Sequence, residues 1–329
     1  MSSAQPSTEV SKFDEFSLLI GKLDAKSGSL QTGSSAKASR TDRDVRYDFL
    51  PRMKSFNDKV AAITGAGSGI GRALALELAR NHCSLALGDI DERTLAETTD
   101  LATRHSVRVT SCKVDVSDRA AIHAWADQVV SDHGKANLIF NNAGVAHAGT
   151  VEDTDYADYE WIMSINFWGV VYGTKAFLPH LKKSGAGHIV NLSSVFGLFA
   201  QPTMGSYNAS KFAVRGFTES LRQELDLMNC GVSATCVHPG GIKTNIARAA
   251  RFSGTMLDLS RNQKVSPGEA ADRLLRTKPE KAAERILAGV RRNARRVLIG
   301  GDAYMLDMMQ RLLPSSYQRL VTASVRLAR

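Results

Sequence analysis

A tyrosine and a lysine four residues apart, Tyr207 and Lys211, lie at the start of a run that is predicted to be helical. Positions i and i+4 share one face of a helix, so the phenol and the ammonium would point into the same space. A free tyrosine has a pKa near ~10, and a nearby cation favours the phenolate and lowers that pKa. About 4 kcal/mol would bring the phenol close to neutral pH, since each pKa unit costs roughly 1.4 kcal/mol. The pair is therefore a candidate general acid and base for an alcohol or a carbonyl group.

On its own this spacing is weak evidence, because such pairs occur by chance on many solvated helices, so the surrounding elements decide its meaning. Short apolar runs alternate with helical segments along the chain. This alternation implies βαβ units and a parallel sheet, and wholly apolar runs are typical of strands covered on both faces. Right-handed crossovers then predict an α/β fold with a Rossmann-type doubly wound parallel sheet. Strands are expected at 60–64, 85–89, 107–114, 137–140, 188–192, 232–237 and 296–299, and helices at 69–81, 91–104, 118–131, 156–182 and 207–228.

The two ends of the chain differ in composition from this central unit. Residues 1–54 are predicted to be a flexible extension with one short helix at 12–23, since Ser, Thr, Gly, Ala and Gln dominate 26–41. Residues 55–300 are predicted to form a single catalytic domain, and 301–329 a helical tail. The apolar residues of the tail are Tyr304, Met305, Leu306, Met308, Met309, Leu312 and Leu313, with Pro314 ending the run. The tail is expected to pack on the domain or across a subunit interface, and the alternatives are a lid over an apolar substrate or a membrane-surface contact.

A glycine-rich turn at 64–71 joins the first predicted strand to the first predicted helix. Glycines let the backbone approach a ligand closely, and the amides and dipole of a helix start favour a pyrophosphate. The general dinucleotide pattern G-x-G-x-x-G fails because position 70 is isoleucine, and the spacing is instead T-G-x-x-x-G-x-G. The residues assigned to cofactor binding here are Thr64, Gly65, Ser68, Gly69, Ile70 and Gly71.

An acidic residue, Asp89, ends the second predicted strand, which is the expected place for a group that binds the adenosine ribose. Its carboxylate would accept from both ribose hydroxyls and repel a 2′-phosphate, so NAD is favoured. NADP stays open because Arg93 could approach that position. The alternative role for Asp89 is a cap on the helix that follows.

The net charge of +9 is concentrated toward the C-terminus, where residues 248–329 hold 17 Lys and Arg against 7 Asp and Glu. The densest cluster is Arg291, Arg292, Arg295 and Arg296. It could serve an anionic membrane surface or a phosphorylated substrate, or be a solvated helix end whose dipole favours cations. No aromatic residues interleave with these arginines, so a nucleic-acid partner is not expected.

No apolar run approaches the ~20 residues of a membrane span, and no secretory signal is recognisable. Cys83, Cys112, Cys230 and Cys236 fit no zinc pattern and are expected to be buried free thiols in a reducing compartment. No cluster has metal-ligand spacing, so no metal is expected. The isolated histidines, His147, His180 and His238, are assigned surface or packing roles. These features favour a cytoplasmic location.

Residues from about 56 to 300 resemble a classical short-chain dehydrogenase/reductase. Four separated motifs carry the resemblance: the turn at 64–71, Asn141-Asn142-Ala143-Gly144, the group Ser194, Tyr207 and Lys211, and Pro239-Gly240. Their order and distances are those of the family, which implies an NAD(P)-dependent oxidoreductase.

The resemblance also implies a role for each matching residue. Tyr207 would be the general acid and base, Lys211 would lower its pKa and bind the nicotinamide ribose, and Ser194 would hydrogen-bond the substrate oxygen. Asn166, inside the long helix at 156–182, would position a water linking Lys211 to solvent; a polar residue there costs stability unless it is satisfied. Residues implied at the adenosine are Ile90, Asp115, Val116, Asn142, Ala143 and Gly144, and those at the nicotinamide are Pro239, Gly240, Ile242 and Thr244.

The substrate pocket is predicted to be mostly apolar. A lid at 242–279 would offer Ile246, Phe252, Met256, Leu257 and Leu259, and the loop after Ser194 would offer Val195, Phe196, Leu198 and Phe199. We therefore expect a small hydrophobic alcohol or ketone as substrate, for which steroid-like, retinoid-like and acyl-chain molecules would all fit.

Two alternatives to an alcohol dehydrogenase remain at this stage. One is an NAD-binding sensor or scaffold that has lost turnover, which the intact Tyr207, Lys211, Ser194 and Asn166 disfavour. The other is a sugar-nucleotide epimerase or dehydratase, which the spacing of the glycine turn disfavours. The apolar faces at 161–178 and 212–225 are consistent with a homo-dimer or homo-tetramer.

Overall fold

The computed structural model describes residues 53–254 and 275–327 of the 329-residue chain. The short helix expected at 12–23, almost all of the extension at 1–54, and the lid residues Met256, Leu257 and Leu259 lie outside the described residues. All described residues belong to one compact unit, Asp48–Arg329.

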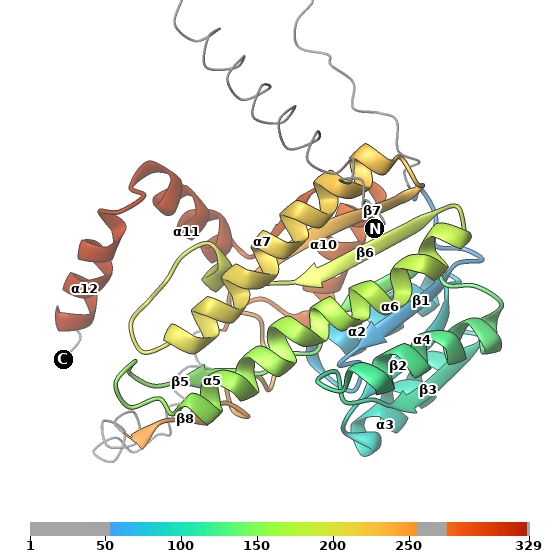
Figure 1. Ribbon diagram of the computed structural model, residues 1–329, viewed down its shortest axis with the longest axis horizontal. Coiled ribbons are helices and arrows are strands. Elements are labelled where there is room, and N and C mark those ends of the chain that lie inside the picture. The colour runs from blue at the N-terminus through green and yellow to red at the C-terminus, as the bar shows by residue number, and fades with distance from the viewer. Residues whose placement is uncertain (1–52, 255–274, 328–329) are drawn as a thin grey trace, which may run out of the picture. The chain divides into compact units, whose positions relative to one another are not determined.

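A seven-stranded sheet with every pairing parallel forms the centre of this unit, in the order β3-β2-β1-β4-β6-β7-β9 (Figure 1). The order reverses between β1 and β4, which is where doubly wound sheets bind ligands, at the carboxyl ends of the strands. The predicted Rossmann-type fold and all seven predicted strands are confirmed. The strands are β1 (Val60–Thr64), β2 (Ser84–Asp89), β3 (Val109–Lys113), β4 (Leu138–Asn141), β6 (Gly187–Leu192), β7 (Val232–Pro239) and β9 (Arg296–Ile299).

Helices cover both faces of the sheet, as its apolar strands require. Alternate residues of β1 separate into two cores, Ala61 and Ile63 on one face and Val60 and Ala62 on the other. The first core includes side chains from α2 (Gly69–Arg80), α3 (Glu92–Thr103) and α10 (Pro279–Arg291). The second includes α4 (Arg119–His133), α6 (Gly169–Lys183) and α7 (Gly205–Met228), which cross in front of the sheet in Figure 1.

The long helix expected at 156–182 is present but changes its winding in the middle. It consists of α5 (Tyr156–Met163), a π-helical turn η1 (Ser164–Trp168) and α6. A π-turn is rare and often marks a functional position. The residue at its centre is Asn166, which is fully buried.

Some elements have no counterpart among the sequence-based predictions. They are α10, a 3-10 turn η2 (Val195–Gly197), and a separate two-stranded parallel sheet of β5 (His147–Ala148) and β8 (Arg251–Phe252). The small sheet joins the segment after β4 to the start of the predicted lid.

The tail is helical as expected and consists of α11 (Gly301–Leu312) and α12 (Tyr317–Leu327). It packs on the domain through Ala303, Asp307 and Tyr317, which are buried. Many of its other apolar side chains are exposed. None of the described helices is long and apolar enough to cross a membrane.

Candidate active site

The carboxyl end of β6 and the first turns of α7 bring Ser194, Tyr207 and Lys211 together in a buried site. Ser194 is the second residue after β6, and its hydroxyl accepts a hydrogen bond from the backbone N–H of Phe196 (3.1 Å). Ser194 also hydrogen-bonds the Tyr207 side chain. The neighbouring Ser193 instead donates to the carbonyl oxygen of Lys211 (2.7 Å). The serine chosen from the sequence is therefore the one that reaches the phenol.

The pKa of Tyr207 differs from the sequence-based expectation. Burial raises it to about 12, and the hydrogen bond from Ser194 lowers it only in part. The expected lowering by Lys211 is absent because the lysine Nζ lies 5.7 Å from the ring centre and donates to the carbonyl of Leu192 (3.1 Å). Burial also lowers the pKa of Lys211 to about 8, which favours its uncharged form. Tyr207 is thus a neutral phenol, set up to donate a proton.

Asn166 is held by its own hydrogen bonds and not by solvent. Its side-chain oxygen accepts from the N–H of Val145 (2.8 Å), and its amide nitrogen donates to the Val145 carbonyl (3.0 Å) and to the hydroxyl of Ser210 (3.0 Å). A methyl group added at Gly144 would lie 3.1 Å from the Asn166 oxygen and 3.3 Å from Lys211 Nζ. The asparagine therefore fixes the segment after β4 against Lys211, in addition to the water-positioning role that the resemblance implies.

The glycine turn lies at the carboxyl end of β1, against the Asn142 segment that follows β4. The Thr64 hydroxyl accepts from the backbone N–H groups of Asn142 (3.0 Å) and Ala143 (3.1 Å). The Asn142 side chain donates to the carbonyls of Thr64 (2.9 Å) and Gly65 (3.1 Å). Gly65 and Gly69 have positive φ values of 65° and 53°, which favour glycine. Hydrogen bonds thus join the glycine turn to the Asn142 segment, two motifs that are far apart in the sequence.

The start of α2 suits an anion. Its N-cap, Ser68, makes no side-chain hydrogen bond to the first turn. The Ser68 hydroxyl therefore does not satisfy the first backbone N–H groups of α2, which could instead bind an anion. A methyl group at Gly71 would collide with the Gly65 carbonyl and lie 2.6 Å from the Asn142 side chain, so only glycine fits there. These features fit the pyrophosphate of a dinucleotide.

Asp89 stands beside the glycine turn, where the sequence placed it. Its carboxylate accepts from the N–H groups of Gly67 (2.7 Å) and Asp91 (3.0 Å). The cap of α3 is Asp91, whose side chain accepts from Arg93 and Thr94, so the alternative role of helix cap for Asp89 is wrong. Ile90 is exposed next to it. Asp115 is exposed and bonded to Ser117, while Val116 is buried against Gly169.

The arginines near Asp89 are already paired. Arg72 donates to the Gly67 carbonyl (2.6 Å) and to Glu97 (2.8 Å), and Arg93 donates to the other oxygen of Glu97 (2.6 Å). Both guanidinium groups are thus drawn to one carboxylate on α3.

Contacts with Asp302 and Thr277 hold the loop after β7 in place. Pro239 ends β7, and a methyl group at Gly240 would collide with the Asp302 carboxylate. Asp302 also accepts from the N–H of Gly241 (2.6 Å), and Ile242 forms a β-bridge with Thr277. Thr244 lies against Gly69, and both residues line a cavity of about 250 Å³. The predicted nicotinamide loop therefore reaches the glycine turn.

Several contacts that support the site were not predicted from the sequence, although His238 was assigned a surface or packing role. His238, on β7, is buried, and its Nδ1 lies 2.9 Å from the carbonyl oxygen of Ser194. Asp302 makes the second. A third is a buried chain of hydrogen bonds that runs from Thr174 through Asn141 and Asn191 to Thr218. For Asn141, Asn191 and His238 the available signal was a polar residue near the end of an apolar strand, and for the helical residues Asp302, Thr174 and Thr218 there was none.

His147 also has a structural role beside the site. Its ring nitrogens lie 2.9 Å from the Ser206 hydroxyl and 3.1 Å from that of Ser253. It therefore connects the start of α7 with Ser253, inside the predicted lid, and the packing role expected for it is confirmed.

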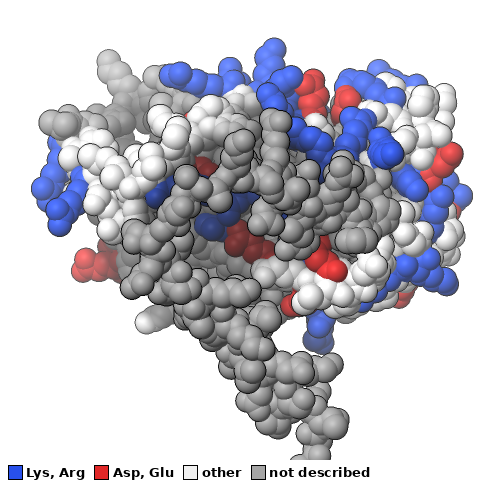
Figure 2. Space-filling model, turned by 90° about the horizontal axis from the view of Figure 1, so that it is seen from above, with Lys and Arg blue, Asp and Glu red and all other residues white. Residues whose placement is uncertain are grey.

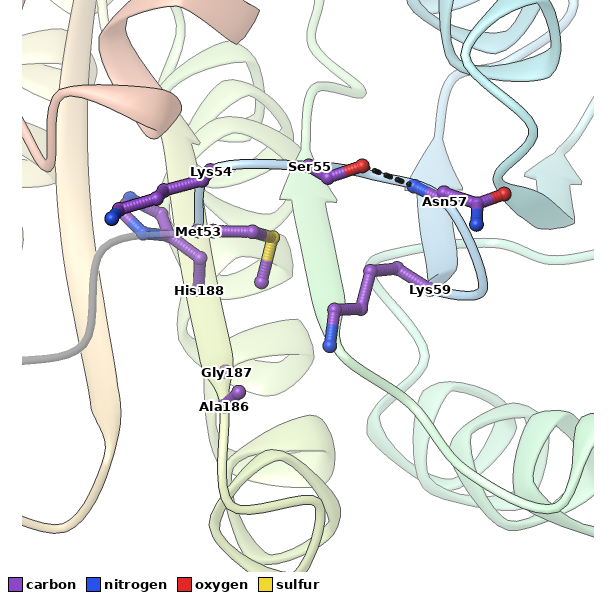
Figure 3. A pocket seen from close by; sticks show the side chains of 8 residues that line it. All are labelled: Met53, Lys54, Ser55, Asn57, Lys59, Ala186, Gly187 and His188. Atoms are coloured by element: carbon purple, nitrogen blue, oxygen red, sulfur yellow. Dashed lines mark hydrogen bonds between the residues drawn. The ribbon is translucent and has the colours of Figure 1, made fainter.

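A second cavity, of about 350 Å³, lies at the opposite edge of the sheet (Figure 3). Its lining includes Lys54, Lys59 and the first residues of β6, Gly187 and His188. Since these residues are at the amino ends of the strands, this cavity is separate from Tyr207.

The arginine cluster is mostly engaged within the fold. Arg291 stacks on Phe56 and donates to Asn81, Arg295 pairs with Asp226, and Arg296 bridges Glu219 and Asp307. The four cysteines are free, but Cys112, on the edge strand β3, is exposed and Cys230 is only partly buried, so the expectation of buried thiols is wrong for these two.

Comparisons with known proteins agree with this geometry. The sequence matches the short chain dehydrogenase family over residues 59–253. It is 51% identical over 274 residues to the Mycobacterium tuberculosis protein named "Putative oxidoreductase SadH", covering 83% of this chain and 97% of that one. It is 31% identical over 271 residues to estradiol 17-beta-dehydrogenase 11 of Homo sapiens, covering 82% of this chain and 84% of that one.

A solved structure is similar over the same region. The short chain dehydrogenase/reductase from Burkholderia phymatum in complex with NAD has a TM-score of 0.70 and 32% identity, covering 79% of this chain and 95% of that one. With the family match and the buried Ser194, Tyr207 and Lys211, this establishes that the chain belongs to the short-chain dehydrogenase/reductase family of oxidoreductases.

Proposed function

We propose that this protein uses NAD to interconvert a hydrophobic secondary alcohol and its ketone. The observation that carries the proposal is the buried hydrogen-bonded pair of Ser194 and Tyr207, adjacent to Lys211 and surrounded by apolar side chains. When bound, the nicotinamide would supply or accept the hydride.

The proton chemistry follows from the two hydroxyl groups. As a ketone becomes an alcohol, negative charge develops on its oxygen and needs both donors and a proton. Tyr207, neutral because burial raises its pKa to about 12, gives that proton. Ser194 offers a second hydrogen bond to the same oxygen. Lys211 and Asn166 keep the surrounding backbone in position through Leu192 and Val145.

NAD is the proposed cofactor because of the charges beside Asp89. Its carboxylate would repel a 2′-phosphate, and Arg72 and Arg93 are both held by Glu97. Thr64, the glycine turn and the Asn142 segment would hold the adenosine and pyrophosphate, and Thr244, next to Gly69, would hold the nicotinamide side. The NAD complex of the Burkholderia phymatum relative supports this preference.

The preference for an apolar substrate rests on the residues around Tyr207. One cluster contains Tyr207, Ile162 and Ala146, and Phe196, Trp161 and Ile246 pack against it. The Phe196 ring meets the Tyr207 ring edge-on at 6.1 Å. A polyol would leave its hydroxyl groups without partners here. Estradiol, named in one relative, is a hydrophobic alcohol of this kind.

The test is the absorbance of NADH during incubation with a panel of steroid-like, retinoid-like, acyl-chain and polyol alcohols, with NAD and with NADP. We expect turnover of apolar alcohols with NAD and its loss in Tyr207→Phe, whose NAD affinity should stay unchanged. Turnover confined to polyols would overturn the apolar pocket. Tight NAD binding without turnover of any alcohol would instead indicate a sensor or scaffold.

A homo-oligomer is part of the same proposal. Trp168 on the π-turn is 46% exposed, and Phe212 on α7 is 38% exposed. These are large apolar groups on the two helices that the sequence suggested for a subunit interface. Sedimentation of the wild-type chain should show a dimer or tetramer that Trp168→Glu weakens, whereas a wild-type monomer would rule this out.

A further inference from the structure

One face of α11 is apolar although it points away from the domain. Tyr304, Met305, Met308 and Leu312 are 56%, 60%, 58% and 72% exposed. At 100° per residue these four side chains fall within one ~100° sector of the helix. Ala303 and Asp307, the buried residues of α11, lie on the other side. The exposed sector therefore belongs to no part of the core that the structure describes.

The next helix, α12, also exposes apolar side chains. Among the side chains of α12 whose burial the structure describes, only Tyr317 is buried, while Leu320 and Val325 are 52% and 41% exposed. Leu320, Val321 and Val325 share a face with Tyr317, and Arg319 and Arg326 project from the opposite one. A helix with an apolar face and a basic polar face is typical of segments that lie in the plane of a membrane surface. We call the exposed side chains Tyr304, Met305, Met308, Leu312, Leu320 and Val325 the tail surface.

The charges around the tail surface are mostly positive. Arg319 and Arg326 on α12 are exposed, and so is most of Arg311 on α11. The two acids of α11 are occupied, Asp302 by the Gly241 N–H and Asp307 by Arg296 and Arg311. At the left end of Figure 2, where Figure 1 shows α11 and α12, basic side chains border uncharged surface. Two copies meeting here would bring arginines together, whereas anionic headgroups would neutralise them.

The two helices that carry the tail surface contact the loops beside the active site through Tyr317 and Asp302. The Tyr317 hydroxyl accepts from the N–H of Ala200 (3.3 Å), and its ring lies 5.0 Å from that of Phe199. Phe199 and Phe196 follow Ser194, and Phe196 contacts Tyr207. Asp302, at the start of α11, holds the loop after β7. Whatever binds the tail surface is thus next to the loops that border substrate and cofactor.

From these observations we infer that the tail surface docks on an anionic lipid surface and positions the substrate entrance against it. The apolar side chains enter the boundary between headgroups and acyl chains, and the arginines contact the headgroups. An apolar substrate dissolved in the lipid then reaches Phe196 and Phe199 without crossing water. The docking stands on the tail surface alone, and only the delivery step rests on the proposed function.

The experiment is co-sedimentation of the full chain with vesicles of phosphatidylcholine alone and with vesicles that also contain phosphatidylglycerol, because attraction to anionic lipids strengthens the binding of basic interfacial helices. The test variant is the double substitution Met308→Glu, Leu312→Glu. Its matched control, Leu227→Glu, Met228→Glu, adds the same charge at two exposed apolar residues at the end of α7. Circular dichroism and thermal melting would check that both variants fold.

We expect the wild type and the control to bind the anionic vesicles, and to bind less at higher salt. The test variant should bind at least about tenfold more weakly, because two apolar side chains no longer enter the lipid. The inference would be overturned if the test variant bound anionic vesicles as well as the wild type does, or if the control lost as much binding as the test variant. It would also be overturned if the wild type bound neutral and anionic vesicles equally well. A wild type that does not bind vesicles would also overturn the inference. If that wild type were a dimer that the test variant dissociates, a second copy of the chain would be what covers the tail surface.

The delivery step has its own measurement. The test variant should oxidise a water-soluble short alcohol as fast as the wild type but a vesicle-dissolved long-chain alcohol more slowly. Equal rates on the vesicle-dissolved alcohol would overturn delivery. If neither alcohol is oxidised while vesicle binding behaves as expected, the proposed function fails and the docking remains.

Discussion

The Nζ of Lys211 lies 5.7 Å from the centre of the Tyr207 ring and donates its hydrogen bond to the carbonyl of Leu192. The lysine therefore supports the backbone of β6 instead of sharing a proton with the phenol. Burial then sets the pKa of Tyr207, which rises to about 12.

This relationship predicts opposite pH dependences for the two reaction directions. Ketone reduction needs the neutral phenol, which persists across the accessible pH range, so its rate should not increase with pH. Alcohol oxidation needs the phenolate, so kcat/KM should increase with pH, by up to about tenfold per pH unit below the operative pKa. Initial rates between about pH 6 and pH 9 measure both, and an oxidation rate that decreases with pH in this range would contradict the assignment of Tyr207 as the base.

A methyl group at Gly144 should disturb the site more than the fold. It would lie 3.1 Å from the Asn166 oxygen and 3.3 Å from Lys211 Nζ, so one of them must shift. We expect Gly144→Ala to lose about tenfold or more in kcat, since small displacements of catalytic groups are costly. Gly216→Ala is the control because nothing lies within 4 Å of its added methyl group. That control should keep its activity and gain roughly 0.5–1 kcal/mol of stability from its helical position; an equal loss of activity in both variants would refute the argument.

Asp89 should decide between the two dinucleotides. Asp89→Ser removes the charge that would face a 2′-phosphate, so the ratio of kcat/KM for NADP to that for NAD should increase by about tenfold or more. Asp91→Ala is the matched control: it removes the cap of α3 and so destabilises the start of that helix, but it leaves Asp89 in place. A cofactor ratio that changes in neither variant, or equally in both, would show that Asp89 does not face the ribose.

His238 should make the fold sensitive to acid. Burial lowers its pKa from 6.5 to about 4, so between these values the unfolded chain binds a proton that the folded chain does not. The free energy of unfolding should therefore decrease as the pH falls through this window, by about 2 kcal/mol at pH 5 from this residue. His188, whose pKa burial lowers to about 3, adds a decrease of the same sign.

Urea unfolding at about pH 7.5 and pH 5 measures this effect. We expect His238→Gln to depend less on pH than the wild type, and His180→Gln, on the partly exposed side of α6, to behave as the wild type does. An unchanged pH dependence in His238→Gln would mean that the ring is protonated in the folded protein as well.

The sheet and the catalytic group could be predicted from the sequence because their signals are local. Runs such as Val60–Thr64 are apolar and bounded by glycine, and the distance from Tyr207 to Lys211 is one helical turn. Asp89 and Thr64 were identified because a parallel sheet places the ends of its strands at one edge. None of these positions needed knowledge of packing.

The features that could not be predicted depend on contacts between distant residues. His147 and Arg251 pair across about a hundred residues in strands of only two residues, too short for any periodic pattern. The role of His238 follows from its contact with Ser194, and the pKa of Tyr207 follows from burial that only the folded chain creates. Nor does the apolar segment Ser164–Trp168 show by its composition that it winds as a π-turn.

That wider turn adds one residue to an otherwise regular helix, and its consequence concerns deletions. Shortening Ser164–Trp168 by a single residue would restore uniform winding and rotate Asn166 by up to ~100° relative to one of its flanking segments. The Asn166 amide would then lose its hydrogen bonds to Val145 and Ser210, although the regular helix would have better backbone hydrogen bonds. The π-turn therefore sets the direction of the Asn166 side chain. Insertions and deletions between α5 and α6 should be tolerated far less than in a surface loop.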